Sequence, residues 1–322
     1  MRHVCFVLVV LALSPLALAW NATGHKTVAA IAWDNMTPKA QERAVAELLE
    51  SQAGDCLHEM FPTDSRPLKE RQREFFIMAA TWPDVVRPKI NQQTKKPDDK
   101  RPCIQFHQPD WHFLDHYWTG VSGGTGSDAP KDDPAIPIKL PNEVGQMELL
   151  QPVVAGTCPS HLQALYLAWI EHLVGDTHQP LHNAGRVTSE PNEQTGDQGG
   201  NLFLLKKEKP TDPSNLHSLW DNIIDESVPR NTNESDLAYV TRVSHKIEQD
   251  HPKNSVGDLK PGKFEEWSKE GFETAKKIAY PATLQRNQTA SATYMATVFD
   301  TCELALAKGG YRLANLFNAM FP

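Results

Sequence analysis

The segment 171–182, EHLVGDTHQPLH, contains residue types that can bind a metal ion. His172 and Asp176 are four residues apart, and His182 follows six residues later. The apolar stripe of a predicted helix over 160–177 continues through His172 and Asp176, so both side chains should face inward. A buried carboxylate without a cationic partner costs on the order of several kcal/mol, a cost that a zinc ion would remove. A buried His–Asp hydrogen bond would also explain this pair.

Further potential ligands occur along the chain. His217 and Asp221, in NLHSLWD, repeat the four-residue spacing on one face of another predicted helix. Asp84 lies in TWPDVVR, and the segment 105–117, QFHQPDWHFLDHY, contains a cluster of imidazoles. These residues favour a metal centre over an isolated His–Asp pair, although spacing alone does not decide which histidine of 105–117 is a ligand.

The N-terminus has the pattern of a secretory signal peptide. A basic start is followed by an apolar run and by Ala-Leu-Ala, an A-x-A cleavage site directly before Trp20. The apolar run is too short to span a membrane. We therefore expect residues 1–19 to be removed and the mature chain, 20–322, to be secreted or periplasmic. The new α-amine of Trp20, with His25 five residues later, would form a metal site that exists only after processing.

Six motifs occur in a fixed order along the mature chain: WxxxGH, WPDxVR, WHFxD, HxxGDxHQPLH, DxGGN and NLHxxWD. In this order they resemble the type I nucleases, which are secreted three-zinc single-strand nucleases and 3′-nucleotidases, distantly related to zinc phospholipase C. The resemblance extends from Trp20 to about Asp221. It implies a mainly α, single-domain helical fold with a few short strands, and one catalytic nuclease domain over 20–322.

The resemblance implies three zinc ions per chain, held by histidine, carboxylate and main-chain ligands. The ligands of the first ion would be Asp84, His112, His172 and Asp176. The ligands of the second would be His182, His217 and Asp221. The ligands of the third would be His25, the α-amine and carbonyl of Trp20, and the other oxygen of Asp176, which would then bridge two ions. The WHFxD motif selects His112 over its neighbours His107 and His116.

The same resemblance implies which residues act on a phosphodiester. Asp115 would orient or deprotonate the attacking water, and Arg87 would contact the phosphate in the transition state. Phe113 would stack on a nucleobase, which requires a base that is not already stacked in a duplex. Asn222 would make a polar contact with the substrate. With zinc activating the water and stabilising the leaving 3′-oxygen, single-stranded DNA or RNA would yield 5′-phosphate products.

Three other functions stay open. A zinc phospholipase C would use a similar metal core, but that branch typically has Glu at the position of Asp221. A non-catalytic secreted zinc-binding protein would have no use for Asp115, Arg87 or Asn222. An enzyme that prefers 3′-mononucleotides over polymers would use the same residues.

The charge of the chain limits its partners. The formal net charge of −8 argues against a protein that grips duplex nucleic acid through a basic face. Bound zinc would supply local positive charge for a nucleic acid or nucleotide substrate. We expect a monomer with no stable protein partner and no membrane association.

The number of cysteines is typical of a secreted protein with disulfide bonds. Of the five cysteines, Cys5 would leave with the signal peptide, and an even number would remain. The expected disulfides are Cys56–Cys103 and Cys158–Cys302, which is one of the possible connectivities.

The pattern of apolar residues predicts a mainly helical chain. Helices are expected near 38–50, 66–80, 160–178, 234–250, 263–280 and 290–308. A short strand is expected at 203–205. Two polar segments, 88–102 and 119–142, should form surface loops that flank His112 and shape substrate access. The loop 196–201, GDQGGN, lies between two groups of ligands and should support the site.

Overall fold

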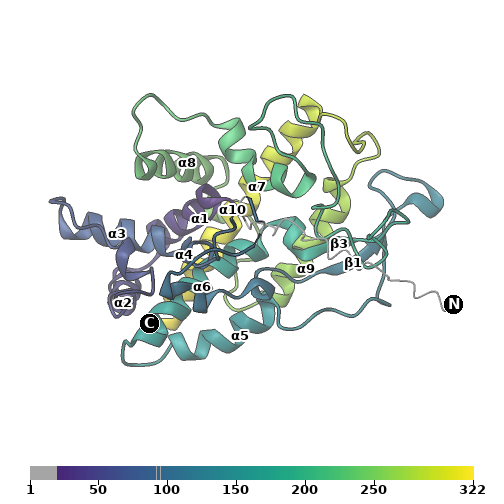
Figure 1. The fold of residues 1–322 in the computed structure, drawn as a ribbon. Helices are drawn as coiled ribbons and strands as arrows, with labels where there is room; N and C mark the ends of the chain where they lie inside the picture. Colours follow the sequence, from purple (N-terminus) through teal and green to yellow (C-terminus); the bar gives the residue numbers. More distant parts are fainter. Residues whose placement is uncertain (1–19, 92, 95) are drawn as a thin grey trace.

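Helices make up most of the fold, and the strands are few and short (Figure 1). The computed structural model describes residues 20–91, 93–94 and 96–322. The predicted signal peptide, residues 1–19, lies outside the described residues. Among the described residues, no helix has both the length and the apolar composition that a membrane crossing needs.

Three helices contribute heavily to the core: α1 (Ala22–Asn35), α6 (His161–Thr177) and α10 (Ala292–Met320). The first N–H groups of a helix have no partner within it, and here the side chains of Asn21, Ser160 and Ser291 accept them. Helix α1 contacts both α10 and α6, and all of residues 23–32 are buried. The core therefore surrounds α1 on every side.

The remaining α-helices are α2 (Pro38–Leu48), α3 (Leu68–Ala79), α4 (Trp82–Val85), α5 (Glu143–Val154), α7 (Leu216–Ser227), α8 (Asp236–Asp250) and α9 (Phe264–Thr274). The helices predicted near 38–50, 66–80, 160–178 and 234–250 are confirmed as α2, α3, α6 and α8. The helix predicted at 263–280 is α9 followed by a π-helical turn, and α10 extends well beyond its predicted end at residue 308. The sequence pattern did not indicate α1 or α5.

Short 3₁₀ segments and the π turn connect these helices. They are η1 (His58–Met60), η2 (Pro102–Phe106), η3 (Pro109–His112), η4 (Gly126–Asp128), η5 (Pro180–Asn183), η6 (Lys253–Ser255) and the π turn η7 (Ala275–Ala279). Segments η3 and η5 end at or contain candidate ligands, so these short turns help to position the site.

A small sheet joins the segment that follows His112 to the segment that follows α6. Its central strand β1 (His116–Thr119) pairs antiparallel with β2 (Lys131–Asp132) and parallel with β3 (Ala184–Arg186). The N–H of Leu114 donates to the carbonyl of His182 at 3.0 Å, just before the sheet begins. This pairing holds two distant parts of the sequence together at the candidate site.

The strand predicted at 203–205 is wrong. Leu204 forms only an isolated bridge with Asn215. Asn215 is the N-cap of α7, so the partner segment turns into a helix directly after the bridge and the ladder cannot extend. The apolar run at this position instead serves as a short turn with two buried side chains, Phe203 and Leu205.

One of the two expected disulfides forms. Cys56 and Cys103 are bonded, with their Cα atoms 5.7 Å apart. The pairing of Cys158 with Cys302 is wrong, because both are free thiols. Cys302 is buried within α10, whereas Cys158 is exposed in the loop between α5 and α6.

Candidate metal centre and active site

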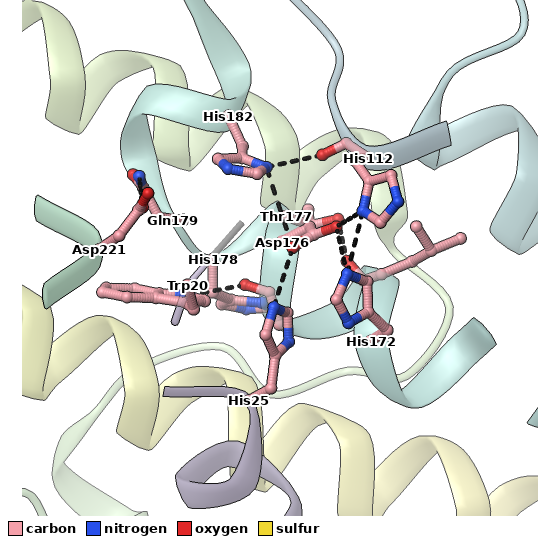
Figure 2. A network of polar contacts seen from close by, with 12 residues as sticks. Trp20, His25, His112, His172, Asp176, Thr177, His178, Gln179, His182 and Asp221 are labelled. Carbon is pink, nitrogen blue, oxygen red and sulfur yellow. Dashed lines mark hydrogen bonds and ion pairs between the residues drawn. The ribbon is translucent and has the colours of Figure 1, made fainter. Parts of the chain in front are cut away.

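Helix α6 places His172 and Asp176 in the core, where both are fully buried (Figure 2). Nδ1 of His112 lies 3.0 Å from Oδ2 of Asp176 and 3.0 Å from Nε2 of His172. Nε2 of His172 lies 3.3 Å from the same carboxylate oxygen. Oδ1 of Asp84, from α4, is 3.9 Å from Nε2 of His172. The four residues expected around the first zinc ion therefore direct ligand atoms toward one another.

A second group forms where η5 meets α7. Nε2 of His182 lies 3.1 Å from Nε2 of His217, which lies 3.5 Å from Oδ2 of Asp221. All three side chains are buried. Gln179 donates to the other carboxylate oxygen of Asp221 at 2.7 Å, which leaves Oδ2 directed toward the histidine. These are the residues expected around the second zinc ion.

His25 extends from α1 toward the other carboxylate oxygen of Asp176 and lies beside His172 (Figure 2). Its Nε2 lies 3.4 Å from Oδ1 of Asp176, and its ring stacks on His172 with the ring centroids 3.8 Å apart. Asp176 thus directs Oδ2 at His112 and His172, and Oδ1 at His25. Gly175 permits this approach of α1 to α6, because a Cβ there would lie 2.7 Å from Nδ1 of His25.

Trp20, the first described residue, is held beside these groups. Its side chain is buried, and its indole N–H donates to the carbonyl of Gly175 at 2.8 Å. The backbone N–H of Asn21 donates to the carbonyl of Asp221 at 3.4 Å. The start of the described chain is therefore fixed to both α6 and α7, next to Asp176 and Asp221.

Backbone carbonyls orient three of the imidazoles. The Nδ1–H groups donate as follows: His172 to Ala80 at 2.8 Å, His182 to His112 at 2.6 Å, and His217 to Gly199 at 2.7 Å. Such a bond fixes the ring and its tautomer, so that the Nε2 lone pair is directed at the ligand group. Metal-binding histidines commonly have this arrangement.

The loop 196–201 supports the second group through its backbone. Gly199 has a φ of +60°, a conformation that favours glycine, and its carbonyl accepts the Nδ1–H of His217. Buried Asp197 accepts the backbone N–H of Arg186 at 3.0 Å, which ties the loop to β3. This glycine-rich loop, which was expected to support the site, thus positions the ring of His217.

The electrostatics of the buried groups match a divalent cation. Burial raises the pKa of Asp176 to about 6 and raises that of Asp221 well above its ordinary range. Burial lowers the pKa of His25 and of His112 well below the ordinary value. Both nitrogens of His25, and Nε2 of His112, have no hydrogen-bond partner among the described residues. A bound cation would compensate the buried carboxylates and use the imidazole nitrogens, and this donor set suits zinc.

A cavity of about 270 Å³ adjoins the candidate ligands His112, His182 and His217. Asp115, Arg87 and Phe113, all predicted site residues, line it together with those histidines. Burial and the nearby carboxylate of Asp197 raise the pKa of Asp115 to about 7. The guanidinium of Arg87 lies 2.8 Å from Asp84. A carboxylate, a cation and an aromatic ring therefore face the same space as the candidate ligands.

Sequence reasoning gave no substrate role to other polar residues that line this cavity: His107, Asp110, Lys139, Gln198 and Asn201. His107 appeared only as a competitor of His112 for the metal. Gln198 and Asn201 belong to the GDQGGN loop, which was expected to support the site from its position between two groups of ligands, but not to contact substrate. Lys139 is exposed in a loop and carries no local signal at all.

A comparison with known protein families shows to which family the chain belongs. A family model described as S1/P1 Nuclease matches residues 20–322. The chain belongs to the S1/P1 nuclease family. The resemblance drawn from the six motifs is thus confirmed at the level of the family.

Characterised relatives match a smaller part of this S1/P1 nuclease family member. Endonuclease 5 of Arabidopsis thaliana is 30% identical over 165 residues, which are 48% of this chain and 50% of that protein. Nuclease P1 of Penicillium citrinum is 28% identical over 170 residues, which are 49% of this chain and 58% of that protein. The chain spans about half the length of the curated relatives it matches.

Asn222 differs from the other predicted site residues of this S1/P1 nuclease family member. It follows Asp221 on α7, yet it is not among the described residues that line the cavity. Its Oδ1 accepts from Asn21 Nδ2 at 3.0 Å, and its Nδ2 donates to the carbonyl of Ser218 at 2.7 Å. Asn222 thus helps to hold the segment after Trp20, and its contact with substrate stays a prediction.

A further group of potential ligands lies at the surface. It consists of Asp34, His245 and Glu248, on α1 and α8. Arg73 pairs with Asp34 at 3.2 Å, and Asn35 donates to Glu248 at 2.7 Å. Ordinary surface contacts already satisfy these carboxylates, so we assign no metal to this group.

Proposed function

We propose that the mature chain is a zinc-dependent phosphodiesterase that hydrolyses single-stranded DNA and RNA to 5′-phosphate products, with 3′-nucleotidase activity at the same site. One observation carries this proposal: buried histidine–carboxylate groups adjoin a cavity that also presents a carboxylate, a cation and an aromatic ring. Membership of the S1/P1 nuclease family supports the reaction class.

The ligand groups would hold three zinc ions. Asp84, His112, His172 and Asp176 would hold the first. His182, His217 and Asp221 would hold the second. His25, the amine and carbonyl of Trp20, and Oδ1 of Asp176 would hold the third. Zinc bound in such sites lowers the pKa of water toward neutrality and neutralises charge that develops on phosphoryl oxygens.

The residues of the cavity wall would supply positioning and proton transfer. Asp115 would accept the proton of the attacking water, and a base is most effective when its pKa lies near the working pH. Burial and Asp197 move the pKa of Asp115 toward that range. Arg87, whose position is fixed by its ion pair with Asp84, would bind the phosphate through its planar array of N–H donors.

Phe113 would provide the preference for single strands. Its ring lines the cavity and is only partly buried, so a face is available to a base. Base–aromatic stacking contributes about 1–3 kcal/mol per base and requires a base that is free of its duplex neighbours. A duplex would have to unstack before it could reach the same position.

Nucleotide release tests the proposal directly. Zinc-loaded mature protein should release 5′-mononucleotides from single-stranded DNA roughly 5- to 150-fold faster than from duplex DNA, the factor that a single stacking contact of about 1–3 kcal/mol gives. A chelator should abolish release, and added zinc should restore it. Hydrolysis of 3′-mononucleotides alone would restrict the enzyme to nucleotidase activity. Hydrolysis of a choline phospholipid instead would support the phospholipase C alternative, and inactivity on all three would support a zinc-binding role.

We also propose that residues 1–19 are removed as a signal peptide, which would make the chain secreted or periplasmic. The contacts of Trp20 and Asn21 with α6 and α7 support this, because they hold the new terminus beside Asp176. The free amine of Trp20 would then complete the third zinc site.

Extension of the mature chain tests the role of this terminus. One glycine added before Trp20 should lower the zinc content from three ions to two and remove most of the activity, because the amine becomes an amide. Elemental analysis and the nucleotide-release assay measure both effects. The same glycine added after Pro322 is the control and should change neither. An N-terminally extended protein with full zinc content and activity would exclude the amine as a ligand.

A further inference from the structure

Lys139 lines the cavity, yet the proposed chemistry gives it no role. It is exposed, in the loop between β2 and α5. Asn142 fixes its backbone, because Nδ2 of Asn142 donates to the carbonyl of Lys139 at 3.1 Å. Oδ1 of the same side chain accepts the N–H of Gly145 at 2.9 Å and so caps α5. The N-terminus of a helix thus positions the backbone of Lys139, while the ammonium group is exposed at the cavity.

The two cations of the cavity wall have different surroundings. Arg87 is mostly buried. Its guanidinium pairs with Asp84 at 2.8 Å and lies 3.4 Å from Nδ1 of His112, so it contacts the residues expected around the first zinc ion. Lys139 is exposed and is near enough to Asp115 to favour the charged form of that carboxylate. Arg87 is therefore placed for a phosphate at the ligand groups, whereas Lys139 marks the solvent-facing edge of the same cavity.

A nucleic acid strand must cross this edge. When one phosphate of a polymer lies at the ligand groups, the chain on either side has to leave the cavity toward solvent, and its neighbouring phosphates pass the exposed wall. An ammonium on a flexible four-carbon stem binds phosphate as a mobile point charge and tolerates variation in backbone position. We propose that Lys139 binds a phosphate next to the scissile one, which makes this wall a subsite for polymeric single strands. The inference rests on the proposed phosphodiesterase activity.

Substrates of different length test this subsite. Lys139→Ala should lower kcat/KM for a single-stranded decanucleotide about tenfold at low salt, through a higher KM, as expected for the loss of one charge-assisted contact. It should leave kcat/KM unchanged for a dinucleoside monophosphate, whose only phosphate is the scissile one. The slope of log(kcat/KM) against log[salt] for the decanucleotide should become shallower by about 0.7, the value for one single-strand phosphate contact.

Two variants serve as controls. Lys131→Ala removes an exposed lysine of β2, the strand just before this loop, which does not line the cavity, and it should behave as wild type on both substrates. Lys139→Arg keeps the charge and should retain most of the activity on the decanucleotide. Equal losses on both substrates in Lys139→Ala would overturn the subsite, because they would show that Lys139 acts through Asp115. Unchanged activity and an unchanged salt slope would also overturn it. A wild-type protein inactive on both substrates would overturn the proposed function itself.

Discussion

Asp115→Asn should lower kcat on single-stranded DNA by roughly 10²–10⁴-fold, the usual contribution of a general base. The amide keeps the size and shape of the carboxylate but cannot accept a proton from the attacking water. Asp115 lines the cavity and does not belong to any of the groups of described residues that could hold a metal ion. The variant should therefore keep its full zinc content, and elemental analysis beside the kinetic measurement checks both parts.

Asp110→Asn is the matched control, because Asp110 lines the same cavity and is exposed. It should change kcat little. The pH profile adds a second readout, since a base must be ionised and the wild-type rate should fall on acidification. The pKa of Asp115 is raised to about 7 in the protein alone, and bound cations would move the acidic limb to lower pH. Loss of zinc from Asp115→Asn would contradict its role as a base and make it part of the metal site.

Helix α6 shows how much of the site follows from local sequence. The spacing of His172 and Asp176 fixes both on one face of any helix, and the apolar residues before them identify that face as the inner one. The structure buries both side chains fully. The same argument holds for His217 and Asp221 on α7, which are also buried. Within one helix, spacing and polarity are enough to predict which polar side chains lie on the buried face.

Helix α1 shows where local patterns fail. Periodicity identifies a helix by the contrast between a polar and an apolar face, and residues 23–32 are buried on every side. This segment has no such contrast between two faces, so the sequence pattern did not predict the helix that carries His25. The second disulfide failed for a related reason. Counting cysteines says nothing of distance, and the fold buries Cys302 in α10 while Cys158 is exposed.

The cavity depends on contacts between elements that are remote in sequence. The pairing of β1 with β3 brings the segment after His112 against the segment after His182, and the cap of α5 adds Lys139 to the same wall. None of these contacts is encoded in a short motif. Sequence therefore indicated the buried candidate ligands, whose motifs are specific, but not the exposed wall of the cavity.

Asp176→Asn should remove most of the bound zinc and abolish measurable cleavage, which is the largest effect we expect from an isosteric change. Oδ2 of Asp176 lies 3.0 Å from His112, and Oδ1 lies 3.4 Å from His25. One amide would thus replace the charged ligand of two zinc sites. Elemental analysis should find a loss at both sites, and the activity assay should find no release above the chelated control.

In the metal-free protein, the same substitution should raise the thermal stability. Burial raises the pKa of Asp176 to about 6, because its charge is costly in the core without a cation. At pH 7 the metal-free Asp176→Asn variant should therefore unfold at a higher temperature than metal-free wild type. With zinc the order should reverse, because ligand binding stabilises the folded state by about 4 kcal/mol at a thousandfold excess over Kd.

Glu171→Gln separates this reversal from a general effect of buried charge. Glu171 lies on the same helix, is buried, and has no hydrogen-bond partner for either oxygen among the described residues. Its substitution should stabilise the protein with and without zinc, and should leave zinc content and activity intact. A reversal seen only in Asp176→Asn would identify Asp176 as the carboxylate that couples metal binding to folding. A full complement of zinc in Asp176→Asn would mean that the histidines and the remaining acids hold the metals without it, and the bridging role would be wrong.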